Sequence, residues 1–422
     1  MLTYIFFGYC LGRKIFLQIR FLTYWRYSIA RHAIMIKNSK ALLVLGLFIG
    51  CTLAFGQNSN RVITTGVPFL LITPDARAAG MGELGVATSA DAYSQQWNPA
   101  KYVFASAEKG MGLSYTPYLS KLVDDIFLGN LTYYKQISDR SSWSTSLKYF
   151  SLGNIQFNEF IGGTIVDQGQ ERPSELTLDL SYALKLSEHF SLAVAGRYIR
   201  SDLRIATDAD NSSANTLGID IAGFYESAPF QMGATNSIFR AGFNTSNIGP
   251  RLNYDIGGQK SFIPTNLKLG FGFDFLYDDA NTLGIYTEFN KLLVPTPVAV
   301  YDEAGVFLGY RQPDIDFLKG IFTSFTDAPG GGAEELSEIT AAIGFEYSFQ
   351  NAFSLRTGYF NESKEKGSRR YLTLGAGFDL NFMTIDISYL FSTSNVRNPL
   401  ENTIRFSLAL DLESPATPIP TE

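Results

Sequence analysis

Residues 176–186, LTLDLSYALKL, alternate apolar and polar side chains without a break. Their even positions are leucine or tyrosine, and their odd positions are Thr, Asp, Ser, Ala and Lys. Successive side chains of a β-strand point to opposite faces, so this stretch predicts a strand with one fully apolar face. The pattern recurs in residues 403–412, and more loosely in 282–290, 353–359, 372–380 and 383–389.

The length of these strands separates two all-β architectures. A soluble β-sandwich also alternates along its strands, so alternation alone leaves it as an alternative. Strands of about ten or more residues, however, match the roughly 9 to 11 residues that cross a bilayer at a tilt. Strands of globular proteins average only about 5 or 6 residues. The pattern therefore favours a transmembrane β-barrel.

The composition agrees with such a barrel. The chain has 34 Phe, 23 Tyr and 38 Gly but only 2 Cys and 2 His, which suits strands and tight turns. Its mean hydropathy is close to zero, too low for a bundle of membrane helices but typical of a barrel with an apolar outside and a polar inside. A net charge of −6 argues against nucleic acid as a partner.

Counting the alternating segments predicts an all-β, 14-stranded antiparallel transmembrane barrel over residues 107–412. The strands are expected at 109–118, 123–135, 142–154, 174–186, 189–203, 214–226, 237–247, 263–277, 281–293, 338–349, 352–362, 369–380, 382–392 and 402–412. Their connections alternate between short and long, as periplasmic turns and outer loops do. Only 119–122 and 227–236 break this order.

The N-terminal region reads as targeting sequence. Residues 35–56 predict a secretory signal peptide, with lysines before an apolar core and small residues at the cleavage position. Gln57 would then be the first mature residue, and residues 1–34 an upstream extension. Cys10 and Cys51 both precede this position, so we expect the mature chain to lack disulfides, thiolate nucleophiles and cysteine-based metal sites.

Residues 57–106 show no strand pattern before the first strand. Their closely spaced glycines provide positive φ angles and close backbone approach, and Asn98-Pro99 is a helix-start signal. We expect either a loop-rich cap or a compact hatch that closes the wide lumen from the periplasmic end. The candidate hatch residues are Asp75, Arg77, Gly80, Met81, Gly82, Trp97, Asn98 and Pro99.

The connection at residues 294–337 is far longer than loops usually run without a function. It contains apolar residues spaced along one helical face, followed by a glycine-rich breaker with Pro329. This face either docks a partner or folds back onto its own barrel. The candidate partner-binding residues are Phe317, Leu318, Ile321, Phe322, Phe325 and Pro329.

The sequence contains little evidence of a catalytic site. His189 is the only histidine after the expected cleavage position, and it lies at a predicted periplasmic turn, remote from any Ser/Asp pair at the outer rim. Acid pairs such as Glu334-Glu335 fall in loops, where we expect them to be solvated. No metal or cofactor is expected. Inward polar residues either line a pore or pack against the hatch, and they include Asp179, Arg197, Glu288, Arg356, Asp386, Arg405 and Asp411.

Several motifs resemble a known family. The stretch from Ile72 to Tyr102 resembles the hatch signature of FadL-like barrels, and the wider set is similar to the PorV subfamily. The motifs run across the expected mature chain and include VPFLLITPDARAAGMG (67–82), LSYTPYLSKLVDDI (113–126), FIPTNLKLG (262–270), SFTDAPGG (324–331) and GYFNESKEKGSRRYLTLGAGF (358–378). Many lie in turns and loops, so the resemblance exceeds shared barrel alternation.

The resemblance implies a FadL-like barrel in the outer membrane of a Gram-negative bacterium, without catalysis, acting in type IX secretion. Implied partners are a large SprA-type translocon barrel, cargo with a C-terminal secretion domain, a PorU-type sortase attachment complex and outer-membrane lipid. The alternative is a FadL-type transporter of hydrophobic small molecules, which should show an apolar pocket beside a kinked strand. One departure is the tail at 413–422, which replaces the usual aromatic barrel end.

Overall fold

The computed structural model describes residues 61–203, 213–254, 260–394, 398–401 and 403–412. The expected upstream extension, the signal peptide and the tail lie outside the described residues. Within the described part, no helix is both long and apolar enough to span a membrane.

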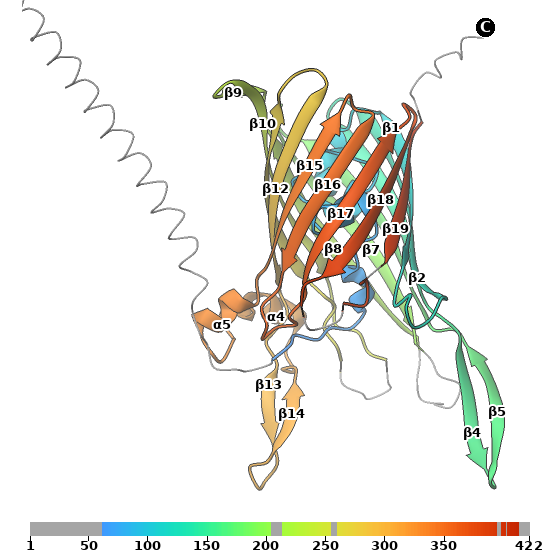
Figure 1. The fold of residues 1–422 in the computed structure, drawn as a ribbon. Helices are drawn as coiled ribbons and strands as arrows, with labels where there is room; N and C mark the ends of the chain where they lie inside the picture. Colours follow the sequence, from blue (N-terminus) through green and yellow to red (C-terminus); the bar gives the residue numbers. More distant parts are fainter. Residues whose placement is uncertain (1–60, 204–212, 255–259, 395–397, 402, 413–422) are drawn as a thin grey trace, which may run out of the picture. The chain divides into compact units, whose positions relative to one another are not determined.

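Fourteen strands form a closed antiparallel barrel, which confirms the predicted fold (Figure 1). Each strand pairs with the next barrel strand along the chain, and β1 pairs with β19 to close the ring. The strands are β1 (Lys109–Pro117), β2 (Ile126–Ser138), β3 (Ser141–Leu152), β6 (Ser174–Lys185), β7 (Phe190–Asp202), β8 (Ala214–Glu226), β10 (Thr235–Ile248), β11 (Asn266–Leu276), β12 (Asn281–Leu292), β15 (Thr340–Phe349), β16 (Phe353–Asn361), β17 (Arg370–Asp379), β18 (Met383–Ser392) and β19 (Ile404–Asp411).

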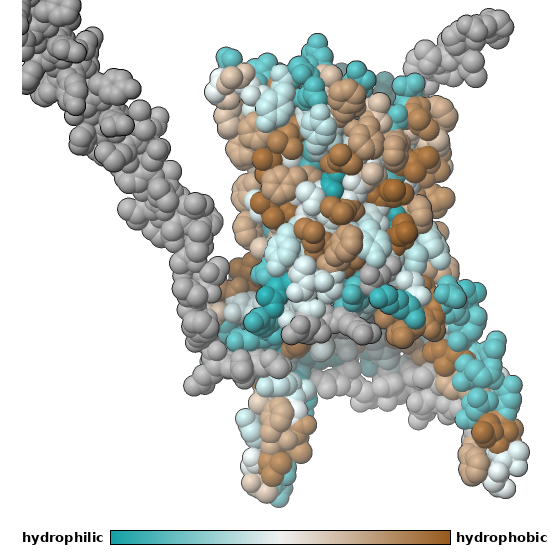
Figure 2. All heavy atoms as spheres, viewed as in Figure 1, coloured by the Kyte–Doolittle hydropathy of each residue, from teal (hydrophilic) through white to brown (hydrophobic). Residues whose placement is uncertain are grey.

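The apolar face of each strand points outward, which is the reverse of a soluble sandwich. On β6, Leu178 and Leu180 are 51% and 61% exposed, whereas Thr177 and Asp179 are fully buried. Apolar residues accordingly gather on the outer wall of the barrel (Figure 2). An apolar exterior around a polar interior is the arrangement of barrels that sit in lipid.

The connections at one end of the barrel carry most of the additional structure (Figure 1). Between β3 and β6 lies a free hairpin, β4 (Ile155–Ile161) and β5 (Thr164–Glu171). Between β12 and β15 lie the hairpin of β13 (Val298–Tyr301) and β14 (Phe307–Arg311) and the helices α4 (Phe317–Thr323) and α5 (Gly332–Ser337). We call this the long-loop end, and the opposite one, where β9 (Phe230–Met232) extends a hairpin, the short-turn end.

The β4–β5 hairpin stands where the sequence analysis placed only a loop. Its turn residues Gly162 and Gly163 both have positive φ, the backbone conformation that two-residue hairpin turns require. A glycine pair flanked by alternating residues is a hairpin signal, so the prediction of a single loop between β3 and β6 is wrong for residues 155–171.

The segment before β1 runs through the lumen from end to end. It contains η1 (Pro68–Leu71), α2 (Ala76–Gly80), α3 (Ser94–Trp97) and η2 (Pro99–Phe104). At the long-loop end, Gly66 N–H donates to the Phe262 carbonyl; near the short-turn end, Ser191 Oγ donates to the Ala100 carbonyl of η2. We refer to residues 61–106 as the lumen segment. We expected this segment to close the lumen only at the end that the sequence predicts to be periplasmic, but it extends through the barrel to the long-loop end.

One tyrosine of the lumen segment touches the seam of the barrel. The Tyr93 hydroxyl lies 2.9 Å from the Leu113 carbonyl of β1 and 2.8 Å from the Leu408 carbonyl of β19. Since β1 and β19 are the pair that closes the ring, this side chain contacts both sides of the closure.

Candidate functional site

The candidate hatch residues begin at Asp75, which holds α2 in place. Its carboxylate caps the helix by accepting from Ala78 N–H at 2.8 Å, and it also accepts from Trp97 Nε1 at 2.7 Å. A carboxylate at a helix N-terminus satisfies free N–H groups and interacts well with the helix dipole. Asp75 thus joins α2 to α3 inside the lumen.

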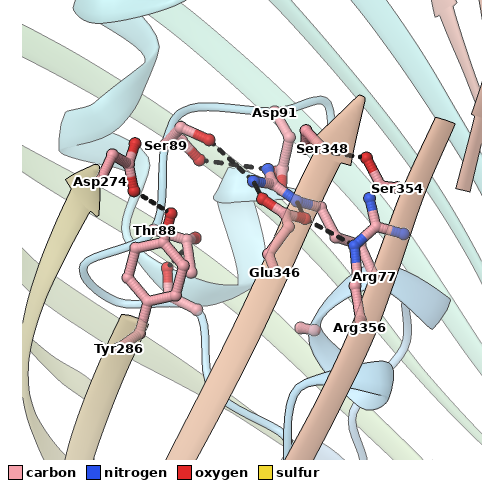
Figure 3. A network of polar contacts seen from close by, with 12 residues as sticks. Arg77, Thr88, Ser89, Asp91, Asp274, Tyr286, Glu346, Ser348, Ser354 and Arg356 are labelled. Atoms are coloured by element: carbon pink, nitrogen blue, oxygen red, sulfur yellow. Dashed lines mark hydrogen bonds and ion pairs between the residues drawn. The ribbon is translucent and has the colours of Figure 1, made fainter. Parts of the chain in front are cut away.

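Arg77 ties α2 to the barrel wall (Figure 3). Its guanidinium donates to both carboxylate oxygens of Glu346 on β15, at 3.0 and 2.8 Å, and to Asp91 at 2.8 Å. Arg356 on β16 donates to the same Glu346 at 2.5 Å and to Asp386 on β18 at 2.6 Å. Through Glu346, this buried network links the lumen segment to β15, β16 and β18. Removing one charge would leave its buried partners uncompensated, which is strongly destabilising.

Glycines bring the backbone of α2 against the wall. Gly82 has a φ of +80°, and its N–H donates to Thr373 Oγ1 at 2.8 Å. A Cβ on Gly80 would lie 3.0 Å from Gly375 Cα, and one on Gly358 would lie 2.1 Å from the carbonyl carbon of Met81. The contact is therefore backbone against backbone, which only glycine on both sides permits.

Asn98 and Pro99 start η2. The Asn98 side chain accepts from Ala100 N–H at 3.1 Å, and Pro99 stands in the first turn. The Asn98 amide also donates to the carbonyls of Val86 and Gly223, at 3.0 and 2.9 Å. All eight candidate residues thus lie in the lumen segment, and their polar groups are used in holding it.

Some of the inward polar residues of the wall contact the same segment. Glu288 accepts from Gly85 and Val86 N–H at 2.8 and 2.9 Å, and Arg405 donates to Glu83 at 2.6 Å. Arg197 forms an ion pair with Asp179 at 2.5 Å. Glu288 and Arg405 thus take the second of the two expected roles, packing against the lumen segment, whereas Arg197 and Asp179 pair with each other across the neighbouring strands β7 and β6.

The candidate partner-binding residues in and after α4 fall into two groups that differ in exposure. Leu318, Phe322 and Phe325 are 50%, 75% and 46% exposed. Phe317 and Ile321 are half-buried, so the expectation of one common exposed face holds only for the first group. The other side of α4 packs inward, since a Cβ on Gly320 would lie 2.9 Å from the Phe262 ring and 3.1 Å from Pro295. Pro329 lies exposed beyond the helix.

Helix α5 is anchored by an ion-pair cluster that the sequence analysis does not predict. Glu334, expected to be solvated, is 5% exposed and pairs with Lys366 at 2.8 Å and with Arg61 at 3.0 Å. Glu338, which follows the helix, pairs with Lys291 at 2.7 Å and with Lys366 at 2.9 Å. The cations lie far from these acids in the sequence, so no local signal predicts the cluster.

The anchoring of α5 should depend on pH in one direction. Burial alone would raise the pKa of Glu334, but hydrogen bonds from Lys366 and Gly330 outweigh it and hold this pKa below the ordinary value of 4.5. A carboxyl with a lowered folded pKa stabilises the fold above its unfolded pKa and loses that contribution as pH falls through the folded value. We expect hydrogen exchange of residues 332–337, corrected for the intrinsic rate, to stay slow from neutral pH to about 5 and to speed up only below that.

Glu334→Gln is the control for this pH dependence. The variant carries no titrating carboxyl at this position, so its exchange profile should lose the acid step. Faster exchange of the unaltered protein already between about pH 7 and 5 would contradict the assignment, because the lowered pKa places the transition below that window.

A cavity of about 480 Å³ lies beside Trp97 and the chain entering the lumen. Residues 62–65 of the lumen segment, β11, β12 and the β16–β17 connection contribute to its lining. Twelve of its twenty lining residues carry polar or charged side chains. The described residues contain no group of His, Cys, Asp and Glu that could hold a metal ion, and His189 Nδ1 lies 2.9 Å from the Glu226 carbonyl.

The comparisons with known proteins come from a family model and from solved structures. A model described as type IX secretion system protein PorV matches residues 55–299. No curated protein matches the chain. The toluene transporter TodX of Pseudomonas putida is 14% identical over 79% of this chain and 96% of that chain, with a TM-score of 0.44. The toluene transporter TbuX of Ralstonia pickettii is 12% identical over 81% and 98%, with a TM-score of 0.45. These structural similarities concern the fold alone.

Proposed function

Since the chain belongs to the PorV family of type IX secretion system proteins, we infer that it binds the translocon and its cargo at the long-loop end of the barrel. In this proposal the protein sits in the outer membrane of a Gram-negative bacterium, surrounded by lipid, and performs no catalysis. It binds a large SprA-type translocon barrel, receives cargo by its C-terminal secretion domain and delivers it to a PorU-type attachment complex.

The exposed face of α4 is the observation that carries this proposal. Leu318 and Phe322 project from a helix whose other side is packed on Phe262 and Pro295, and Phe325 is exposed in the turn that follows the helix. A helix and turn held on one side, with two phenylalanines exposed on the other, resemble the aromatic anchors found at the centres of protein interfaces. The side chains lie outside the barrel wall, so lipid burial of the strands does not account for them.

The β13–β14 hairpin extends the same surface. Tyr301, Phe307 and Leu308 are exposed near its tip, and the hairpin projects beyond the barrel at the long-loop end (Figures 1 and 2). An isolated two-stranded hairpin is only marginally stable in water, so packing against a partner would stabilise it. Exposed apolar patches of this kind mark interaction sites. Together, α4 and the hairpin offer a partner an apolar surface on the segment 294–337.

The transporter alternative finds less support in the lumen. A carrier of hydrophobic molecules should enclose an apolar pocket, whereas the cavity beside Trp97 includes the charged residues Lys268, Lys366 and Arg369 in its lining. A strand irregularity does occur, where the β8–β10 register shifts between Thr245 and Ile248. There Asn247 N–H donates to Asp220 at 2.7 Å and its amide to the Pro264 carbonyl at 2.9 Å, so the irregular backbone is itself well bonded.

The test replaces the three exposed residues while keeping the packed side of α4. In Leu318→Glu/Phe322→Glu/Phe325→Glu, copurification of the translocon from detergent-solubilised outer membranes should fall by at least about 30-fold, since one buried aromatic anchor contributes roughly 2 kcal/mol. Cargo secretion should fall with it. Substitution is a more specific test than deletion of the helix, because Gly320 and Asp314 contact Phe262 and Arg251 of the β10–β11 connection, and a deletion would remove these contacts as well.

The matched control, Lys319→Glu/Thr326→Glu, adds acidic residues to the same exposed segment but leaves its apolar face intact. It should copurify with the translocon like the unaltered protein. If the triple variant reaches the outer membrane and still binds translocon and exports cargo normally, α4 is not the docking surface. Equal losses in both variants would point to added charge as the cause and would also count against the apolar contact.

A further inference from the structure

The cavity beside Trp97 has features that neither the docking surface nor the lumen packing uses. Its lining contains three cationic side chains, Lys268, Lys366 and Arg369, and three carboxylates, Glu83, Glu338 and Glu362. Lys366 pairs with Glu334 and Glu338, and Arg369 pairs with Glu362 at 2.9 Å. Among the described residues, no carboxylate lies within ion-pair distance of Lys268. Its ammonium instead lies 4.2 Å from the centre of the Trp97 ring.

Two asparagines of the cavity lining have buried amide oxygens that accept no hydrogen bond from any other described residue. They are Asn266 on β11, which is 5% exposed, and Asn290 on β12. Asn290 stands directly opposite Lys268 in the β11–β12 register, and Asn266 is two residues from Lys268 on the same strand. Neighbours of this kind share one face of a sheet, so the ammonium and both amides belong to one inward patch.

Unpartnered buried polar groups are costly, and native proteins retain few of them without a reason. An ammonium lacking a carboxylate calls for an anionic group, and free amide oxygens call for donors such as hydroxyls. The Trp97 ring and aliphatic side chains of residues 62–71 supply the apolar part of the lining. A volume of about 480 Å³ falls within the range of small-molecule sites.

We propose that this cavity binds a small organic anion rich in hydroxyl groups, with the chemistry of an acidic sugar. The ligand's carboxylate pairs with Lys268, and its hydroxyls donate to Asn266 and Asn290. A hydroxyl suits an amide side chain because it both donates and accepts. The assignment uses only the lumen side chains and does not depend on the secretion role of the protein.

The experiment titrates the mature protein in detergent with D-glucuronate by isothermal calorimetry. D-glucose, which lacks the carboxylate, and decanoate, which lacks the hydroxyls, serve as comparison probes. In a Trp143→Phe background, Trp97 is the only tryptophan from residue 57 onward, so its fluorescence reports whether the ligand enters this cavity. We expect saturable glucuronate binding with a change in Trp97 emission, and at least about ten-fold weaker binding of both comparison probes.

Lys268→Met should weaken glucuronate binding at least about ten-fold, which is the loss of one ion pair. Asn266→Asp, nearly isosteric but anionic, should weaken it similarly and serves if the first variant does not fold. The matched control is Lys185→Met, because Lys185 lies 4.5 Å from the Phe104 ring in a similar contact outside this cavity. No binding of glucuronate, equal effects of Lys268→Met and Lys185→Met, or tighter binding of decanoate would each overturn the proposal.

Discussion

Replacing Glu346 by alanine should destabilise the folded barrel by about 3 to 5 kcal/mol, the cost of leaving buried charges without their partner. Glu346 is 8% exposed and accepts from Arg77 of the lumen segment and from Arg356 of the wall. Its removal leaves both guanidiniums in the lumen with less negative charge to balance them. Neither arginine can lose its proton to relieve this, because the guanidinium stays charged.

The measurement is urea unfolding of the mature protein refolded into lipid vesicles, followed by tryptophan fluorescence. Glu303→Ala is the control, since Glu303 lies exposed in the β13–β14 turn, and it should change stability by no more than about 0.5 kcal/mol. Glu346→Gln keeps the shape but removes the charge, so it should fall between the two. A loss for Glu346→Ala as small as that of the control would show that the network does not stabilise the barrel.

Alanine at Gly358 should displace the lumen segment. Its Cβ would lie 2.1 Å from the Met81 carbonyl carbon and 2.3 Å from Gly82 N, so backbone atoms have to move. Overpacking of this kind costs typically about 1 to 3 kcal/mol. Because the obstruction pushes α2 away from the wall, we expect the lumen to conduct ions more readily.

Planar-bilayer conductance of the Gly358→Ala variant tests this expectation, together with the vancomycin sensitivity of cells that carry it. Gly196→Ala is the matched control, because a Cβ on this strand glycine meets no atom within 4 Å. It should leave conductance and drug sensitivity unchanged. A Gly358→Ala protein that is as stable and conducts as little as the control would contradict the predicted displacement of the lumen segment.

The sequence predicted the wall of the barrel better than its contents. The alternation of apolar and polar residues within a short stretch such as 176–186 is enough to predict a strand. The predicted strand boundaries agree with the structure to within three residues. Strand length then decided that the leucines face lipid. The interior is different, because Arg77 and Glu346 are 269 residues apart and nothing near either residue identifies its partner.

The candidate partner-binding site was predictable only in part. Helical spacing gave the position of α4, but it could not tell that Ile321 turns inward while Phe322 points to solvent, since that depends on Phe262 and Pro295 from elsewhere in the chain. Likewise, Glu334 looked like a solvated loop acid. Its burial results from Arg61 and Lys366, which the closed barrel brings to the same rim.

The contact of Tyr93 with both β1 and β19 has a consequence for biogenesis. The ring closes between the first and last strands to be synthesised, and the side chain at that closure belongs to a segment made before either of them. Tyr93 can reach both carbonyls at once only when β1 and β19 are paired, so this contact forms no earlier than the closure of the ring.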